Sequence, residues 1–231
     1  MPRSELIVAL DVVGAAEALS MVDRLPPEVS WYKIGLELFC AEGPAVIQAV
    51  RARGKNVFLD LKLHDIPRTV ERAILSAARH GAGMLTVHAA GGRAMLKAAA
   101  DAARRCPQPP RLIAVTTLTS LDQRDLADLG IMRPPQVHVM SMADMALKQG
   151  IHGMVCSPQE VESLRARFGS RTLLVTPGIR PAGSDPGDQK RVATPSAAVR
   201  AGADFLVVGR PILEAPDPVT AARAILKEMA V

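Results

Sequence analysis

Eight short apolar runs, spread along the chain, constrain the fold more than any other feature of this sequence. They lie at 6–10, 32–34, 57–63, 84–87, 112–117, 154–156, 173–176 and 205–208. Runs of this length, rich in Val, Ile and Leu, predict buried β-strands. The intervals mostly carry Ala, Leu, Arg and Glu at helical spacing, as at 15–25, 45–53, 70–80 and 219–229. Strands that alternate with helices predict a parallel sheet of the α/β class.

The number of strand–helix units favours a closed barrel over an open sheet. A (β/α)8 TIM barrel places eight such units in about 250 residues, whereas a doubly wound sheet more often has about five or six strands. The chain has 231 residues, and no linker-like stretch divides it. We therefore expect residues 1–231 to form a single barrel domain, with its active site at the C-terminal ends of the strands. The longest interval is expected to hold an extra turn or short helix around 121–137, where Pro134 and Pro135 interrupt the helical pattern.

Composition excludes several classes of protein. Apolar residues make up 48% of the chain, enough for one sizeable core and too many for a disordered or collagen-like protein. No apolar run approaches the roughly 20 residues needed to cross a bilayer, and the first run stops too early for a signal peptide. Cys40, Cys106 and Cys156 have no CxxC spacing, which fits reduced, buried side chains better than disulfides or a zinc site. We expect a cytoplasmic protein without membrane contact.

The positive charge does not by itself indicate nucleic-acid binding. The formal net charge is +5, but Lys and Arg are scattered through helical stretches and aromatic residues make up only 3% of the chain. Single-stranded nucleic acids are usually held by basic grooves with aromatic stacking surfaces. We interpret most of these cations as solvated helix faces, with a few available to bind a small anionic ligand.

Charged residues lie where the predicted strands end, which is the end of such a barrel that carries chemistry. Because strand side chains alternate, Phe58, Asp60 and Lys62 are expected to point into the barrel while the leucines between them point outward. The same alternation directs Lys33, in the second run, and Asp11, after the first, inward. Four charged side chains should therefore approach one small volume.

An ionic cluster of this kind favours a functional role over a purely structural one. Desolvating several ions costs several kcal/mol each. Buried ions would therefore stabilise the barrel little compared with Val and Leu at the same positions. Carboxylates beside a lysine favour its ammonium form, which is a poor nucleophile. Lys62 is better suited to deliver a proton to a carbon that becomes negative during a reaction.

Two glycine-containing turns predict a phosphate site. Gly178 and Arg180 follow the seventh run, and Gly209 and Arg210 follow the eighth. Barrels of this kind commonly bind phosphate after these two strands, where backbone N–H groups and arginines meet the anion. The polar, Gly- and Pro-rich stretch 182–189 between the turns is predicted to be a mobile lid. No metal site is expected, since His64 and His88 do not match any metal-binding spacing.

Together these motifs resemble the orotidine 5'-phosphate decarboxylase family. The DxKxxD signature occurs as Asp60-Leu61-Lys62-Leu63-His64-Asp65, and it is accompanied by VALD ending at Asp11, YKIG around Lys33, TPGIR ending at Arg180, and VGRP around Arg210. The resemblance covers essentially the whole chain. It implies a homodimer that converts orotidine 5'-phosphate to uridine 5'-phosphate and carbon dioxide in pyrimidine nucleotide synthesis, without metal or organic cofactor.

The resemblance also implies roles for individual residues. Lys62 would donate a proton to C6, and Lys33, Asp60 and Asp65 would complete an alternating charge array. Asp65 and Thr69 would reach the active site of the partner subunit. The implied substrate contacts are Asp11 and Lys33 with the ribose, Thr119 with the pyrimidine, Gln189 and Arg210 with the phosphate, assisted by Arg180 and Gly209, together with Asp60, Ile66 and Thr69. Ser120 remains an alternative to Thr119.

Other functions stay open at this stage. Sugar-phosphate decarboxylases and synthases share the DxKxxD signature, and such an enzyme would hold a divalent metal at its carboxylates. A Schiff-base aldolase would need Lys33 or Lys62 uncharged, which the acidic neighbours oppose. A non-catalytic nucleotide-binding or RNA-associated protein is favoured only by the positive charge, and it would bind polynucleotides in a salt-sensitive way.

Overall fold

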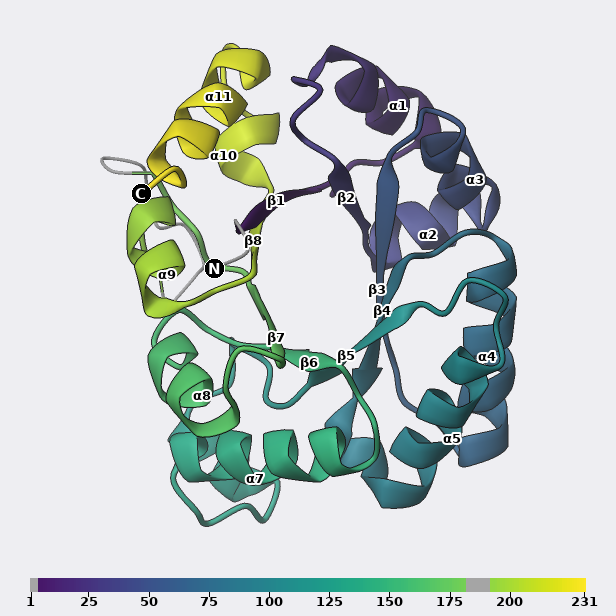
Figure 1. The fold of residues 1–231 in the computed structure, drawn as a ribbon, viewed down its shortest axis with the longest axis vertical. Helices are drawn as coiled ribbons and strands as arrows, with labels where there is room; N and C mark the ends of the chain where they lie inside the picture. The colour runs from purple at the N-terminus through teal and green to yellow at the C-terminus, as the bar shows by residue number, and fades with distance from the viewer. Residues whose placement is uncertain (1–3, 182–191) are drawn as a thin grey trace.

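The computed structural model describes residues 4–181 and 192–231. Its eight strands are all parallel and close into a barrel in the order of the sequence, with helices around the outside (Figure 1). The ring closes where β8 (Phe205–Val208) pairs with β1 (Glu5–Ala9). The predicted (β/α)8 barrel is therefore confirmed.

Each predicted strand is present. The others are β2 (Trp31–Ile34), β3 (Asn56–Leu63), β4 (Met84–His88), β5 (Arg111–Val115), β6 (Gly153–Val155) and β7 (Leu173–Thr176). The α-helices described are α1 (Ala15–Arg24), α2 (Leu36–Glu42), α3 (Ala45–Arg51), α4 (Pro67–Arg79), α5 (Gly92–Arg104), α6 (Gln123–Asp128), α7 (Pro135–Lys148), α8 (Val161–Phe168), α9 (Pro195–Ala201), α10 (Arg210–Leu213) and α11 (Pro218–Glu228). None of the helices within the described ranges is long and apolar enough to cross a membrane.

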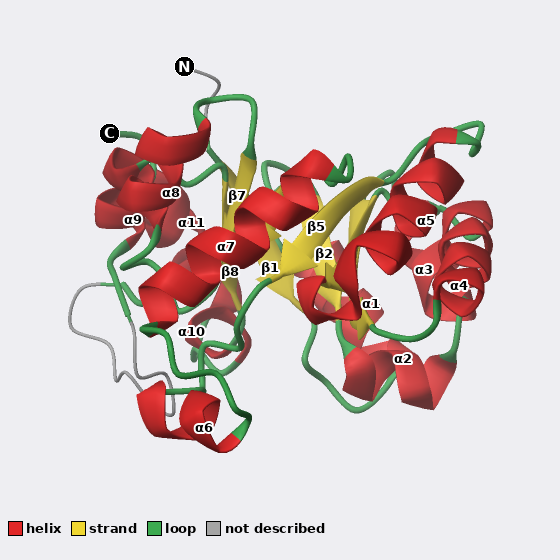
Figure 2. Cartoon of the chain, turned by 90° about the horizontal axis from the view of Figure 1, so that it is seen from below, coloured by secondary structure: helices red, strands yellow, loops and turns green. Residues whose placement is uncertain are grey.

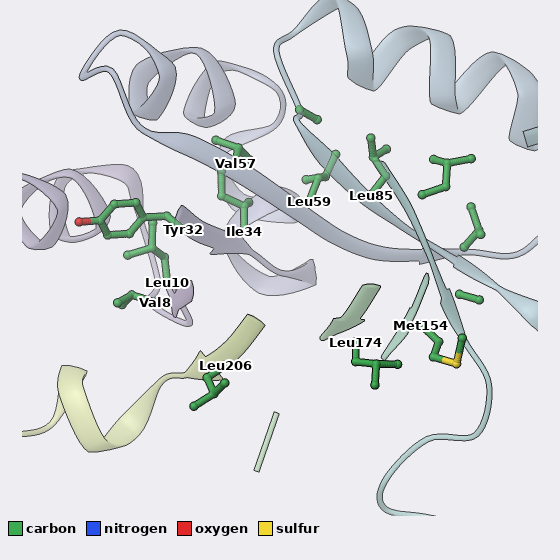
Figure 3. Close-up of a cluster of buried hydrophobic side chains, with 14 of the residues drawn as sticks. Val8, Leu10, Tyr32, Ile34, Val57, Leu59, Leu85, Met154, Leu174 and Leu206 are labelled. Atoms are coloured by element: carbon green, nitrogen blue, oxygen red, sulfur yellow. The ribbon is translucent and has the colours of Figure 1, made fainter. Parts of the chain in front are cut away.

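Strand alternation divides the core into two layers. Side chains such as Trp31, Phe58 and Phe205 fill the barrel interior, where the rings of Trp31 and Phe205 meet edge to face at 5.7 Å. A larger cluster fills the space between barrel and helices, and Figure 3 shows part of it, including Leu59 and Leu85. Alternate residues of one strand thus contact different layers, as the predicted orientation of β3 requires.

The interval between β5 and β6 contains the expected short helix, but its prolines have a different effect. Asp122 caps α6 by accepting hydrogen bonds from the N–H groups of Arg124 and Asp125. Pro134 and Pro135 do not merely interrupt the pattern, because they begin α7. The first turn of a helix has N–H groups without helical acceptors, so a proline costs little there.

The cysteine prediction is correct for two of three residues. Cys106 and Cys156 are buried and unbridged, whereas Cys40 is exposed on α2. Its side chain lies outside the apolar stripe of that short helix, which buries Leu38.

The two ends of the barrel carry different elements. Figure 2 shows α2, α6 and α10 at one end and the C-terminus of the chain at the other. These three helices follow β2, β5 and β8, so they mark the C-terminal ends of the strands. This end, called the mouth below, carries the charged residues singled out in the sequence.

Candidate active site

The pairing of β3 with β4 becomes irregular where the charged residues lie. Leu59 pairs with Leu85 and Leu63 pairs with Val87, so β3 has three residues, 60–62, opposite the single residue Thr86 of β4. Such a bulge bends a strand and redirects its side chains. Lys62 has a φ of 51°, the one positive φ at a non-glycine position in the described part of the chain. The backbone is therefore strained at the central lysine of the signature.

Thr86 connects the two charged residues of this bulge. The Lys62 ammonium lies 3.0 Å from Oδ2 of Asp60, and the Thr86 hydroxyl donates to Oδ1 of the same carboxylate at 3.0 Å. The hydroxyl oxygen also accepts the backbone N–H of Lys62 at 2.8 Å. The Asp60 side chain is only 14% exposed, against 35% for Lys62. The carboxylate is thus largely buried and held by two hydrogen-bond donors, while the lysine side chain is more exposed to solvent.

A second ion pair joins the first two strands. Nζ of Lys33 lies 2.7 Å from Oδ1 of Asp11, and the lysine side chain is 12% exposed while the aspartate is 54% exposed. Gly35 lies directly against this pair, since a Cβ there would be 3.0 Å from the Lys33 amine and 3.2 Å from Oδ1 of Asp11. A glycine at this position allows the backbone to pass close to both charges.

The four charges predicted to converge form two separate pairs. Among residues 4–181 and 192–231, no ion pair joins Asp11–Lys33 to Asp60–Lys62. Asp65 is exposed, and its Oδ1 accepts the N–H of Ile66 at 2.6 Å. Within one chain, the structure thus brings together the members of each pair but leaves Asp65 apart from both lysines.

Ile66 and Thr69 lie near Asp65 on the surface of the mouth. Ile66 caps the N-terminus of α4 and is 68% exposed, and Thr69, in the first turn of α4, donates its backbone N–H to the carbonyl of Ile66 at 3.0 Å. Pro67 occupies the first helical position, where its fixed φ suits the start of a helix. Asp65, Ile66 and Thr69 are therefore all exposed to solvent at the start of α4.

Two histidines stack beside the β3 bulge. The rings of His64 and His88 are 5.1 Å apart and nearly parallel, at 17°. Nδ1 of His88 accepts the backbone N–H of Ala90 at 3.2 Å, so that nitrogen carries no proton. Burial, followed by the charges of His64 and Lys62, lowers the pKa of His88. The imidazole of His88 is consequently neutral near pH 7 and adds no charge beside Lys62.

The two glycine turns predicted to hold a phosphate lie at the ends of β7 and β8. Gly178 has a φ of 75°, and the turn is fixed by paired backbone hydrogen bonds from Arg180 to Ala193 and from Ala193 to Gly178. Gly209 is the N-cap of the four-residue helix α10, and the exposed Arg210 begins that helix. A Cβ at Gly209 would lie 3.6 Å from Oδ2 of Asp11. The β8 turn is thus adjacent to the Asp11–Lys33 ion pair.

The remaining predicted contacts are less fully described. Thr119 lies in a turn after β5 and is partly exposed, and Ser120 beside it is exposed. Gln189 and the predicted lid at 182–189 lie outside the described residues. No group of three or more His, Cys, Asp or Glu side chains in the described ranges is placed to hold a metal ion.

Sequence reasoning missed the hydroxyl group of Thr86. It contacts both members of the Asp60–Lys62 pair, and its position two residues after Met84, on the inner face of a strand, was the available signal. The hydroxyls of Thr116, Thr117 and Ser157 are buried without a hydrogen-bond partner among the described residues. They follow β5 and β6, so they add buried polar groups to this end of the barrel.

The chain is similar to known proteins over nearly its whole length. The family model of the orotidine 5'-phosphate decarboxylase / HUMPS family matches residues 4–225. The chain is 54% identical over 224 residues to orotidine 5'-phosphate decarboxylase of Anaeromyxobacter sp. (strain K), covering 97% of each protein. It is 49% identical over 229 residues to the enzyme of that name from Nitrosococcus oceani, covering 99% of each.

A solved structure is also similar over the full length. The crystal structure of orotidine 5'-phosphate decarboxylase from Lactobacillus acidophilus matches with a TM-score of 0.87 and 39% identity, covering 99% of this chain and 100% of that one. Sequence and fold lead to the same conclusion. This chain belongs to the orotidine 5'-phosphate decarboxylase / HUMPS family.

Proposed function

We propose that the protein decarboxylates orotidine 5'-phosphate to uridine 5'-phosphate, with Lys62 as the proton donor to C6. The observation that carries this proposal is the Lys62 ammonium, held 3.0 Å from Asp60 at the mouth of the barrel. Relatives with about half of their residues identical are named for this reaction. The reaction is the step of pyrimidine nucleotide synthesis that forms uridine 5'-phosphate.

The chemistry explains why an ammonium group is needed. When the bond between C6 and the carboxyl carbon breaks, its electron pair stays on C6 in the plane of the pyrimidine ring, where the π system cannot delocalise it. A fixed positive charge at that carbon stabilises the developing carbanion. Lys62 then transfers a proton to C6, carbon dioxide leaves, and the neutral amine regains a proton from water.

The other polar groups bind and orient the substrate in this proposal. Asp11 and Lys33 contact the ribose, and Thr119 contacts the pyrimidine. Arg210 and Gln189 bind the phosphate, assisted by Arg180 and the backbone at Gly209. Asp60 holds the Lys62 amine in place and lies near the substrate carboxylate. Binding energy from the distant phosphate keeps the ring in its reactive position, so a nucleoside without phosphate should react far more slowly.

We further propose that the active protein is a homodimer with shared sites. The exposed start of α4 places Asp65, Ile66 and Thr69 where a second subunit can meet them. Large exposed apolar side chains also lie after β1 and β2, where Val13 is 75% and Leu36 is 55% exposed. Burial of these side chains would favour the association of two subunits through the mouth ends of their barrels. Asp65 then completes the charge array of the partner's site.

One assay tests the reaction class directly. Purified protein in excess chelator should consume orotidylate, measured as loss of its absorbance, and Lys62→Ala should abolish turnover while leaving the fold intact. Near-normal activity of that variant would rule out its role as proton donor. Loss of wild-type activity in chelator would favour the metal-dependent sugar-phosphate chemistry instead.

Subunit mixing tests the shared site. Lys62→Ala and Asp65→Ala each damage a different half of a shared site, so mixed dimers should contain one intact site and regain some activity. Lack of recovery after subunit exchange has been demonstrated would contradict sharing. That residues 1–231 act as one domain, located in the cytoplasm, stays a prediction.

A further inference from the structure

We infer that Thr86 is a positioning residue that sets the orientation of the Asp60–Lys62 pair for catalysis. This inference rests on the proposed function of that pair. Thr86 is completely buried in β4, and its hydroxyl contacts a side chain and a backbone group on the neighbouring strand. Its only contact with the catalytic lysine is with the backbone N–H of Lys62. Thr86 therefore acts on the reaction by positioning that backbone and the Asp60 carboxylate.

The direction of both hydrogen bonds follows from the atoms involved. The backbone N–H of Lys62 can only donate, so the Thr86 oxygen accepts it at 2.8 Å. An ionised carboxylate can only accept, so the single hydroxyl hydrogen of Thr86 goes to Oδ1 of Asp60 at 3.0 Å. The hydroxyl has one hydrogen and cannot exchange these roles. Oδ2 of Asp60 is thereby left to face the Lys62 ammonium.

The bulge explains why this hydroxyl is needed. The strand pairing skips residues 60–62 of β3, so the N–H of Lys62 binds a side chain rather than a backbone carbonyl of β4. That N–H belongs to the residue with a φ of 51°. A buried N–H without an acceptor is costly, and a strained backbone persists only where its surroundings hold it. Thr86 therefore holds both the backbone that carries the amine and the carboxylate that orients it.

Substitution of Thr86 by valine removes the hydroxyl and keeps a β-branched shape. The hydrogen bond lost is one to a charged group, and losing such a bond in a reactive geometry should lower kcat about 10- to 100-fold. KM should change by less than about threefold, because the substrate contacts proposed above do not include Thr86. Thr86→Ser keeps the hydroxyl and should retain kcat within about threefold of the wild type.

A matched control separates this role from general loss of stability. Thr172 is also buried, and its hydroxyl donates to the carbonyl of Phe168 at the end of the barrel opposite the mouth. Thr172→Val makes the same chemical change there, so it should lower stability without lowering kcat. Steady-state kinetics and urea unfolding of Thr86→Val, Thr86→Ser and Thr172→Val supply the comparison.

The outcomes distinguish this inference from the proposed function. If Lys62→Ala is inactive but Thr86→Val keeps kcat within about twofold, or if the serine variant loses as much as the valine variant, the positioning role is wrong. If Lys62→Ala itself stays active, the proposed function is wrong instead. Should Thr86→Val fail to fold, Thr86→Ala provides the second hydroxyl-free variant; failure of both to fold would assign Thr86 a structural role and overturn the inference.

Discussion

The strained backbone at Lys62 leads to a prediction with an unusual sign. Glycine in place of alanine normally destabilises a strand by about 0.5–1 kcal/mol, because the unfolded chain has more freedom to lose. At a left-handed φ, however, a residue with a Cβ costs about 1–2 kcal/mol more than glycine. Lys62 has a φ of 51°. Subtracting the middle of the first range, about 0.75 kcal/mol, from the middle of the second, about 1.5 kcal/mol, leaves about 0.75 kcal/mol in favour of Lys62→Gly over Lys62→Ala.

The second lysine of the site supplies the control. Lys33 lies in the regular strand β2, and it is not among the described residues with positive φ. Lys33→Gly should therefore be less stable than Lys33→Ala by about 0.5–1 kcal/mol. Both variants at each position remove the same side chain and the same ion pair, so those losses cancel within each comparison.

Urea unfolding of the four variants at one protein concentration measures these differences, since dimerisation would make stability depend on concentration. The expected result is opposite signs at positions 62 and 33. Equal signs at the two positions would refute the argument that the signature lysine is held in a strained conformation. Both Lys62 variants should also be inactive, because neither carries an amine.

Three further predictions concern the neighbouring groups. Arg210→Ala should raise KM for orotidylate more than it lowers kcat, and an unchanged KM would argue against a phosphate contact. Gly35→Ala should weaken substrate binding, because its Cβ would lie 3.0 Å from the Lys33 amine; wild-type kinetics would mean that the pair shifts without consequence. His88 has a lowered pKa in the folded state, so its neutral form stabilises the protein above a pH of about 6.5, and this contribution is lost as pH falls through the lowered value. When the pH is lowered from 7 to 5, the free energy of unfolding measured in urea should therefore fall less for His88→Asn than for the wild type. An equal fall in the two proteins would contradict this.

Much of the fold could be predicted because it depends on local pattern. The eight apolar runs became the eight strands, and alternation correctly placed Phe58 in the barrel interior and Leu59 in the outer layer. The role of Pro135 was misjudged, since a proline interrupts a helix internally but is tolerated at its first position. Which of these applies depends on where the helix begins, and local pattern specifies helix ends poorly.

The candidate site was predictable in its membership and less so in its arrangement. Alternation correctly indicated that Lys62 and Asp60 would meet, and the structure adds that Lys33 pairs with Asp11 instead of joining them. The contribution of Thr86 could not be found from β3 alone. It depends on the bulge that leaves one residue of β4 opposite three of β3, and that register is a property of two strands packed together.

The sequence by itself determined a barrel with charged side chains at one end, because apolar periodicity specifies which face of every strand and helix must be buried. Tertiary structure decided how those charges are partnered. Ion pairs and hydrogen bonds depend on distances of a few ångströms between segments far apart in the chain, and only strand register and packing set those distances. The positive φ of Lys62, the hydroxyl of Thr86 on Asp60 and the outward position of Asp65 all result from that packing.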